Sequence, residues 1–381
     1  MGLFSKKPTS YLGIDIGSSS VKIIELEKTD GKPRLKNYGF AERNRRVGSG
    51  RTEEIIQTSA SIIAKISKEA GFTSKSVVSA LHNFDVFSSV INVSVEHPEL
   101  LDENIKIEAR KFVPMQLEDV ILDWKMLTTE DAAPAKKEKT QFGDTDKELK
   151  EEEPKNSQLF DGAGNKTADV LLTAAPRRLV KKYVDIFKIA GLNLLSLETE
   201  SFAFIRALMD KRDDSSILFL DIGAVATDII ITERQAPIII RSIDVGGDSI
   251  TAAIAKNMHI AIERAEQFKR DVGVFDRKSA EDMRMITEII ELSFAPVINE
   301  IQYSIDLYKS RNRSLGKIVL SGGGSCMAGL SDFLQTTFHI PIYMGNPWYK
   351  IETPPDLKDA LLELGAMFTV SIGLALKEIE G

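Results

Sequence analysis

A short apolar run ending in Asp-Ile-Gly, followed by small residues and a second apolar run, occurs twice in this chain. The first copy is YLGIDIGSSSVKIIEL at residues 11–26, and the second is ILFLDIGAVATDIII at residues 217–231. Apolar runs of this length on either side of turn residues predict two buried strands, so each copy predicts a β-hairpin with a polar tip. The repetition indicates two related halves that hold a ligand between their tips.

Each predicted tip combines a carboxylate with a glycine. Asp15 precedes Gly17 in the first copy, and Asp221 precedes Gly223 in the second. Glycine lets backbone N–H groups approach an anion closely, and a carboxylate beside phosphates needs a cation such as hydrated magnesium. Two facing tips would therefore hold a polyphosphate, whereas a single Asp-x-Gly more often forms only a tight turn.

A third glycine run follows another predicted strand. Residues 318–330 read IVLSGGGSCMAGL, a strand that enters Gly322, Gly323 and Gly324 before a helix expected to begin near Met327. A strand, loop and helix of this kind offers backbone donors and a helix N-terminus to adenosine or phosphate. The alternative is a plain glycine-rich turn.

Composition narrows the class of protein. A length of 381 residues predicts two domains, and a formal net charge of -7 argues against a nucleic-acid binder, which needs concentrated Lys and Arg. The single cysteine, Cys326, excludes an intramolecular disulfide and fits a reducing cytoplasm. No stretch looks long and apolar enough to span a bilayer, and the start has no secretory core, so we expect a cytoplasmic protein.

A separate α/β module is expected inside the first half. The first half itself is expected to contain a helix at 52–70 and a strand at 77–81. The module then has strands at 86–95, 119–127, 168–173 and 192–197 and helices at 99–112 and 176–190. Its polar interruption at 129–166 contains KKEKTQFGDTDKELKEEEPKNSQ and predicts a disordered loop, either simply solvated or with a regulatory or docking role.

The second half has its own sequence of elements. A helix at 198–208 leads into the second hairpin, and the turn IDVGGDSITAAIAKNM and the helix AIERAEQFKRDVG follow a strand at 238–245. An amphipathic helix at 287–309 is expected to pack on this half. The last helix, 359–379, contains Glu363, Gly365 and Ser371, which favour a packed helix over a membrane span.

This order of elements resembles the actin-like ATPase superfamily and, within it, the PilM family of cytoplasmic type IV pilus assembly proteins. GIDIGSSSVKIIEL resembles the first phosphate loop of that family, and EARKFVPMQLEDVILDW at 108–124 resembles a segment of its inserted subdomain. The likeness covers nearly the whole chain apart from 129–166. The FtsA family shares the inserted subdomain but characteristically ends in a linker and a membrane-binding helix.

The resemblance implies an α/β actin-like ATPase fold, with two domains flanking a nucleotide cleft and an FtsA-like inserted subdomain. Subdomain IA would comprise 9–83, completed by 196–214 and 355–381. The inserted subdomain IC would comprise 84–195. Domain II would comprise 215–354, divided into IIA and, at about 249–315, IIB.

The same resemblance implies an ATP and magnesium site. Asp15 and Asp221 would hold Mg²⁺ through water. Donors to the β and γ phosphates would come from the two loops, at Gly17, Ser18, Ser19 and Gly223. Lys22 would contact phosphate, although alternation along the hairpin could instead place its side chain in solvent.

Further positions would line the nucleotide. Gly246 and Gly247 would border it, and the three glycines at 322–324 would form the adenosine loop. Glu266 and Lys269, in the AExxK pattern, would lie near the ribose, or they would form an ordinary pair on a helix surface.

Hydrolysis is less well supported than binding. Glu200 or Asp228 would orient the attacking water, yet both could equally be structural acids. The second loop departs from DIGGGTTDI because Ala224 and Val225 replace glycines, and Val225 resists positive φ. We therefore expect at most a slow ATPase.

The resemblance implies a scaffold of the pilus assembly platform, recruited to the inner face of the cytoplasmic membrane. Its partner would be the N-terminal cytoplasmic tail of a PilN-like membrane protein, captured by the inserted module, and nucleotide would set its conformation. The oligomeric state stays open. The alternatives are an FtsA-like, filament-forming cell-division protein and a kinase of sugars or other metabolites.

Overall fold

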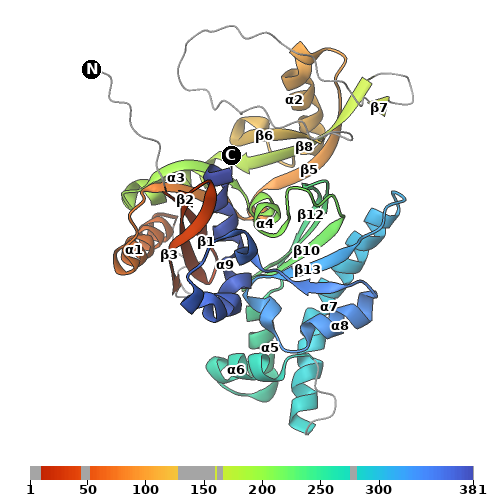
Figure 1. Cartoon of the computed structure of the whole chain (residues 1–381). Helices are drawn as coiled ribbons and strands as arrows, with labels where there is room; N and C mark the ends of the chain where they lie inside the picture. The colour runs from red at the N-terminus through yellow and green to blue at the C-terminus, as the bar shows by residue number, and fades with distance from the viewer. Residues whose placement is uncertain (1–9, 44–51, 128–158, 161–165, 275–280, 381) are drawn as a thin grey trace. The chain divides into compact units, whose positions relative to one another are not determined.

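Two five-stranded sheets with the same strand arrangement form the framework of the protein (Figure 1). The computed structural model describes residues 10–43, 52–127, 159–160, 166–274 and 281–380. Neighbouring strands of the first sheet are β3 (Lys32–Glu42), β2 (Ser20–Thr29), β1 (Ser10–Ile16), β4 (Ser76–Leu81) and β9 (Asn193–Thr199). Those of the second are β12 (Ala236–Ile243), β11 (Thr227–Glu233), β10 (Ile217–Ile222), β13 (Lys317–Ser321) and β14 (Ile342–Met344).

The repeated sequence corresponds to a structural duplication. In each sheet the first two strands in chain order, β1 and β2 or β10 and β11, form the antiparallel hairpin that the sequence predicts. The fourth strand in chain order, β4 or β13, runs parallel to the first. Strands β1 and β10 are buried along almost their whole length. Both hairpins therefore lie at the centre of a sheet and end at the same relative position.

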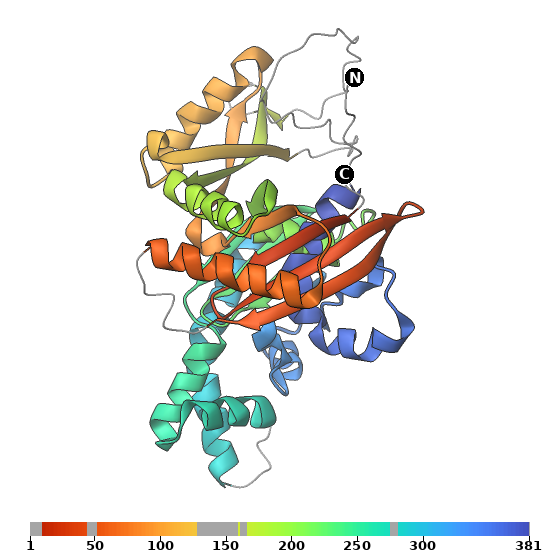
Figure 2. The same ribbon diagram turned by 90° about the vertical axis from the view of Figure 1, so that its left-hand side faces the viewer.

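Helices cover the outer faces of both sheets and fill the space between them. The outer face of the first sheet is covered by α1 (Thr52–Ala70) and α3 (Arg177–Ile189), which Figure 2 shows in front of it. The second sheet packs on α5 (Gly247–Met258), α6 (Ile262–Val272), α7 (Glu281–Lys309) and α8 (Leu330–Phe338). Between the sheets lie α4 (Glu200–Leu208) and α9 (Lys358–Glu380).

Helix α9 passes the length and composition test for a membrane span. An 18-residue window within Pro355–Glu380 has a mean hydropathy of 1.6, so the expectation that no stretch is long and apolar enough is wrong by length and composition. However, 67% of its apolar window is buried inside the protein, against both sheets. This burial agrees with the interpretation of a packed core helix.

A smaller compact unit, residues 88–174, is inserted in the main one. Its sheet has the order β5 (Phe87–Ser94), β8 (Lys166–Pro176) and β6 (Val120–Leu127), with β7 (Leu159–Phe160) paired to β8. Helix α2 (Leu101–Phe112) buries Ile105 and Ala109. The predicted loop at 129–166 lies mostly outside the described residues.

The inserted unit is shorter than the predicted 84–195. Helix α3 buries Leu179, Tyr183, Ile186 and Phe187 in the core beneath α1 and the first sheet, and β9 pairs with β4 in that sheet. Both elements therefore belong to the main unit, because their apolar faces complete its core. The helix expected to begin near Met327 instead begins at Leu330, after a 3₁₀ turn at Gly323–Cys326.

The turns of the corresponding hairpins β2–β3 and β11–β12 give a stability prediction. The first uses Asp30 (φ 51°) and Gly31 (φ 82°), whereas the second forces Arg234 (φ 45°) and Gln235 (φ 62°) into the same left-handed region. Replacing Arg234 by Asn and Gln235 by Gly should raise the free energy of unfolding by about 1 kcal/mol, measured by urea denaturation. Gly31→Ala is the matched control and should lower it; a double variant no more stable than the wild type would contradict the prediction.

Candidate functional site

The two hairpin tips place different side chains at equivalent positions. Asp15 lies opposite Lys22 in the first hairpin, and Asp221 lies opposite Asp228 in the second. Lys22 is turned inward, with its Nζ 3.0 Å from Asp15 Oδ2 and 14% of its side chain exposed. The alternative in which Lys22 faces solvent is therefore wrong, and its positive charge lies at the first tip.

The second tip concentrates negative charge. Burial, together with the charge of Asp228, raises the pKa of Asp221 well above its usual value. Burial and the charge of Glu200 likewise raise the pKa of Asp228 to about 7. Asp228 is buried and Asp221 is half-buried, and carboxylates that face one another away from water are unfavourable without a cation, so this arrangement suits a bound positive ion.

The donor set fits magnesium bound through water. Within the described ranges, no group of three or more His, Cys, Asp or Glu side chains lies close enough to hold a metal ion directly. Magnesium commonly keeps several of its waters and takes one or two carboxylates together with phosphate oxygens. Asp15 and Asp221 could supply such outer contacts, and the ion would neutralise phosphate charge.

An arginine that the sequence reasoning missed holds the first loop. The guanidinium of Arg43 donates to Gly17 O at 2.9 Å and to Ser59 Oγ at 3.3 Å, and its backbone N–H donates to Ser19 O at 2.7 Å. These bonds tie the loop that contains Ser18 to the end of β3. Arg43 thereby fixes the positions of the backbone groups that were predicted to meet phosphate.

The N-terminus of α5 holds the second loop. Gly247 N–H donates to Gly223 O at 3.0 Å, and Asp248 N–H donates to Ala224 O at 2.8 Å. Gly246 and Gly247 thus lie beside the loop, but this N–H of Gly247 is already bonded within the protein. Val225 has no positive φ, so the expected backbone conflict does not arise.

Glu266 and Lys269 are not an ordinary surface pair. Lys269 is 8% exposed, and its Nζ donates to Gly247 O at 3.1 Å, Thr251 Oγ1 at 2.9 Å and Glu266 Oε2 at 2.7 Å. Burial alone would raise the pKa of Glu266, but hydrogen bonds from Lys269 and Thr251 outweigh it and lower the pKa to about 2. The AExxK helix is therefore joined to the turn that holds the second loop.

The third glycine loop packs against the second tip. A Cβ placed on Gly322 would lie 2.3 Å from Asp221 Oδ1, and one on Gly324 would lie 2.4 Å from Ile222 Cγ2. The N–H of Gly322 also donates to Ala366 O of α9 at 3.0 Å. With Gly323 between them, these glycines bring the loop to the acidic pair, as expected for loops that share one site.

The turn after β4 contains His82, which the sequence reasoning also missed. Its Nδ1 lies 2.7 Å from Glu200 Oε1, and its Nε2 lies 3.0 Å from Ile16 O, just before the first loop. Burial alone would lower the pKa of His82, but the charge and hydrogen bond of Glu200 outweigh it and raise the pKa to about 10. The ring is therefore an imidazolium that donates from both nitrogens.

Asn83, the next residue, connects the two halves of the main unit. Its N–H donates to Glu200 Oε2 at 3.1 Å, its Nδ2 donates to Asp228 Oδ2 at 3.0 Å, and its Oδ1 accepts from Ser201 Oγ at 2.8 Å. Asp228 Oδ1 accepts a further bond from Ser242. Every carboxylate oxygen of Glu200 and Asp228 thus has a partner, which favours the structural alternative for both acids over orientation of water.

A sequence signal for His82 and Asn83 was present. They directly follow the buried strand β4, which runs parallel to β1. Ligand sites of α/β sheets lie at the carboxyl ends of such strands, so polar residues there are candidates. The predicted tips, the glycine turn and this dipeptide are therefore brought together at one end of the two sheets.

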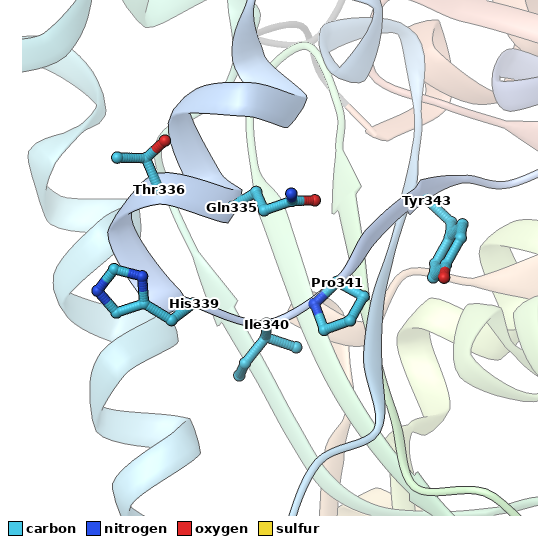
Figure 3. A pocket seen from close by; sticks show the side chains of 6 residues that line it. All are labelled: Gln335, Thr336, His339, Ile340, Pro341 and Tyr343. Atoms are coloured by element: carbon cyan, nitrogen blue, oxygen red, sulfur yellow. The ribbon is translucent and has the colours of Figure 1, made fainter.

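A surface pocket lies elsewhere in the second half (Figure 3). Its lining comes from the end of α8 and the start of β14: Gln335, Thr336, His339, Ile340, Pro341 and Tyr343. Pro341 O accepts a bond from Ile318 N–H, at the start of β13, whereas the glycine loop follows the end of that strand. The pocket is therefore at the opposite end of β13 from the candidate site.

The sequence of the chain is similar to those of known protein families. Residues 13–141 and 161–379 match a family model described as "Type IV pilus assembly protein PilM". The chain is also 21% identical over 366 residues to the cell division protein FtsA of Bacillus subtilis, covering 89% of this chain and 79% of FtsA.

Two solved structures show the fold. The PilM–PilN type IV pilus biogenesis complex has a TM-score of 0.78 at 24% identity, over 97% of this chain and 99% of that chain. MreB5 of Spiroplasma citri bound to AMPPNP has a TM-score of 0.50 at 12% identity, over 97% and 95% of the two chains. The predicted α/β actin-like ATPase fold is confirmed.

Proposed function

Because the chain belongs to the PilM family of type IV pilus assembly proteins, we propose that it is a cytoplasmic, ATP- and magnesium-binding scaffold of the pilus inner-membrane platform. Its partner is the N-terminal cytoplasmic tail of a PilN-like membrane protein, and nucleotide sets its conformation. A PilM–PilN complex with the same fold supports the choice of partner. Recruitment by that tail would place the chain at the inner face of the cytoplasmic membrane.

One observation carries the nucleotide proposal. The second tip has two carboxylates, the half-buried Asp221 and the buried Asp228, with raised pKa values and no cation-forming side chain at the position where the first tip has Lys22. Bound magnesium and the phosphates it accompanies would balance these charges. The loops at Gly17 and Gly223 would supply backbone donors, although the N–H of Gly223 itself donates to Ala226 O at 2.9 Å and is not free for phosphate as predicted. The glycine loop at 322–324 would receive the adenosine.

Hydrolysis is proposed to be slow at most. Phosphoryl transfer to water needs a residue that orients the water, and each carboxylate oxygen of the two candidates, Glu200 and Asp228, already has a hydrogen-bond partner within the protein. The proposed role of ATP binding is therefore to set the conformation of the protein rather than to drive ATP hydrolysis.

The first experiment is calorimetry with a synthetic peptide of the PilN-like tail, with and without Mg-ATP. A tail that prefers the nucleotide-bound form must raise ATP affinity by the same factor, because the coupling is reciprocal. Tighter peptide binding in Mg-ATP supports the proposal. Equal peptide affinity with and without Mg-ATP would refute the coupling between nucleotide and tail but would still support docking of the tail. No peptide binding in either condition would show that the proposed partner is wrong.

Replacement of Asp15 tests the nucleotide site. Asp15→Asn should weaken magnesium-dependent ATP binding at least about tenfold, because a carboxylate that orients the hydrated ion is lost and Lys22 loses its partner. Asp356→Asn, at an exposed turn, makes the same charge change away from the site and should leave affinity unchanged. Fluorescent ATP titration, with and without magnesium, measures both; unchanged affinity of the Asp15 variant would refute the site.

The second candidate is a filament-forming protein like FtsA, which the similarity to FtsA over 89% of this chain and 79% of FtsA favours. A filament former should sediment when Mg-ATP is added. The same run would give the oligomeric state without nucleotide. If the chain does not sediment with or without Mg-ATP, the scaffold hypothesis is favoured over the filament hypothesis.

A further inference from the structure

Helix α3 has a basic face that its packing leaves exposed. Its apolar residues Leu179, Tyr183, Ile186 and Phe187 are buried in the core of the first sheet. On the other side, residues at positions i, i+4, i+7 and i+11 form one line along the helix. These exposed residues are Arg177, Lys181, Val184 and Lys188.

The charge on this face contrasts with the rest of the chain. Arg178 flanks the line, and the acid on the same face, Asp185, pairs with Lys181 at 2.5 Å. On α3 itself this face has four cations and one anion, in a chain whose net charge is -7, and Glu53 of α1 lines the same groove as Lys188. A concentration of positive charge on an acidic protein indicates an anionic partner at this location.

The first turn of α3 has the sign of charge that a helix N-terminus does not favour. Its first turn contains Arg177 and Arg178, no acidic residue and no side-chain cap. The N-terminus of a helix carries partial positive charge, so cations there are unfavourable and anions are favourable. The first turn is thus unfavourable for the isolated helix and becomes favourable when phosphate groups lie beside it.

One exposed apolar side chain lies in this line, and a second lies at its edge, in a groove beside α1. Val184 is 45% exposed and Ile189 is 49% exposed. A free phosphate ion would use the charges but not these side chains, whereas a helix lying on an anionic bilayer uses both, with basic groups at the headgroups and apolar groups below them. We propose that this face of α3 binds the surface of a membrane that contains anionic phospholipids.

This proposal goes beyond the proposed scaffold function and does not depend on it. Docking on a short tail would bring the chain close to the bilayer, and a basic face would add a direct, orienting contact. The contact is weak by itself, since each basic residue near an anionic surface raises the partition coefficient only about fivefold.

Flotation of the full chain with lipid vesicles tests the proposal. The chain should bind phosphatidylcholine vesicles that contain phosphatidylglycerol, should not bind phosphatidylcholine alone, and should detach as salt is added. The double variant Arg178→Gln, Lys188→Gln should lower the partition coefficient at least about tenfold. Thermal unfolding checks that the variant is folded.

The matched control is Lys65→Gln, Lys68→Gln on α1, which removes two exposed cations from another helix of the same unit. It should keep most of the binding. No binding to anionic vesicles, equal binding to neutral ones, or an equal loss in both double variants would overturn the proposal. Because the vesicles contain no protein, these outcomes are distinct from those of the tail titration.

Discussion

Replacing His82 by alanine is expected to lower the free energy of unfolding by about 3 kcal/mol at neutral pH, because Glu200 would remain buried without its counter-charge. Glu200 has only 9% of its side chain exposed, and its partner imidazolium is 2.7 Å away. The variant would also lose the bond to Ile16 O that connects the turn to the first hairpin. Urea denaturation of both proteins measures the difference.

The pH dependence of this loss follows from the raised pKa of His82. Its folded pKa of about 10 lies above the ordinary value of 6.5, so the pair stabilises the fold fully below pH 6.5 and loses that contribution as the pH rises towards 10. The difference between wild type and variant should therefore shrink between these values. A difference that stays constant would show that lost packing, not charge, is responsible.

A second His–Glu pair supplies the control. His97 lies 3.3 Å from Glu99, but two thirds of each side chain is exposed to water. Exposed ion pairs contribute less than about 1 kcal/mol, so His97→Ala should have little effect. An equal loss in both variants would contradict the role of burial.

The sequence predicted the central part of the fold because its signals are local. An apolar run of seven or so residues ending in Asp-x-Gly specifies a buried strand and a turn, and both hairpins formed as expected. The assignment of α3 to the inserted module failed because sequence order gives no information on which core an amphipathic face will join. Helix α3 belongs to the main unit because its apolar face packs against α1 and the first sheet.

The sequence predicted individual residues of the candidate site but not the hydrogen bonds that join them. The sequence identified Asp15, Asp221 and the glycines, since these residues have backbone or charge properties that can be read singly. It missed Arg43, and the His82–Asn83 dipeptide, because their roles depend on partners far along the chain. Asn83, for example, bonds to residues 117 and 145 positions away.

The close packing of α9 on β1 leads to the other large expected effect. A Cβ on Gly13 would lie 1.9 Å from Ser371 O, a backbone atom of α9, so the helix would have to move away from the strand. Gly13→Ala should lower the free energy of unfolding by at least about 3 kcal/mol, since α9 fills the space between both sheets and cannot move without opening two core clusters. Gly316→Ala is the control, because its nearest neighbour, Ser216 O, is at an ordinary 3.5 Å. If Gly13→Ala were as stable as Gly316→Ala, the contact between helix and sheet would be looser than the structure shows, and α9 could not hold the two hairpins in fixed positions.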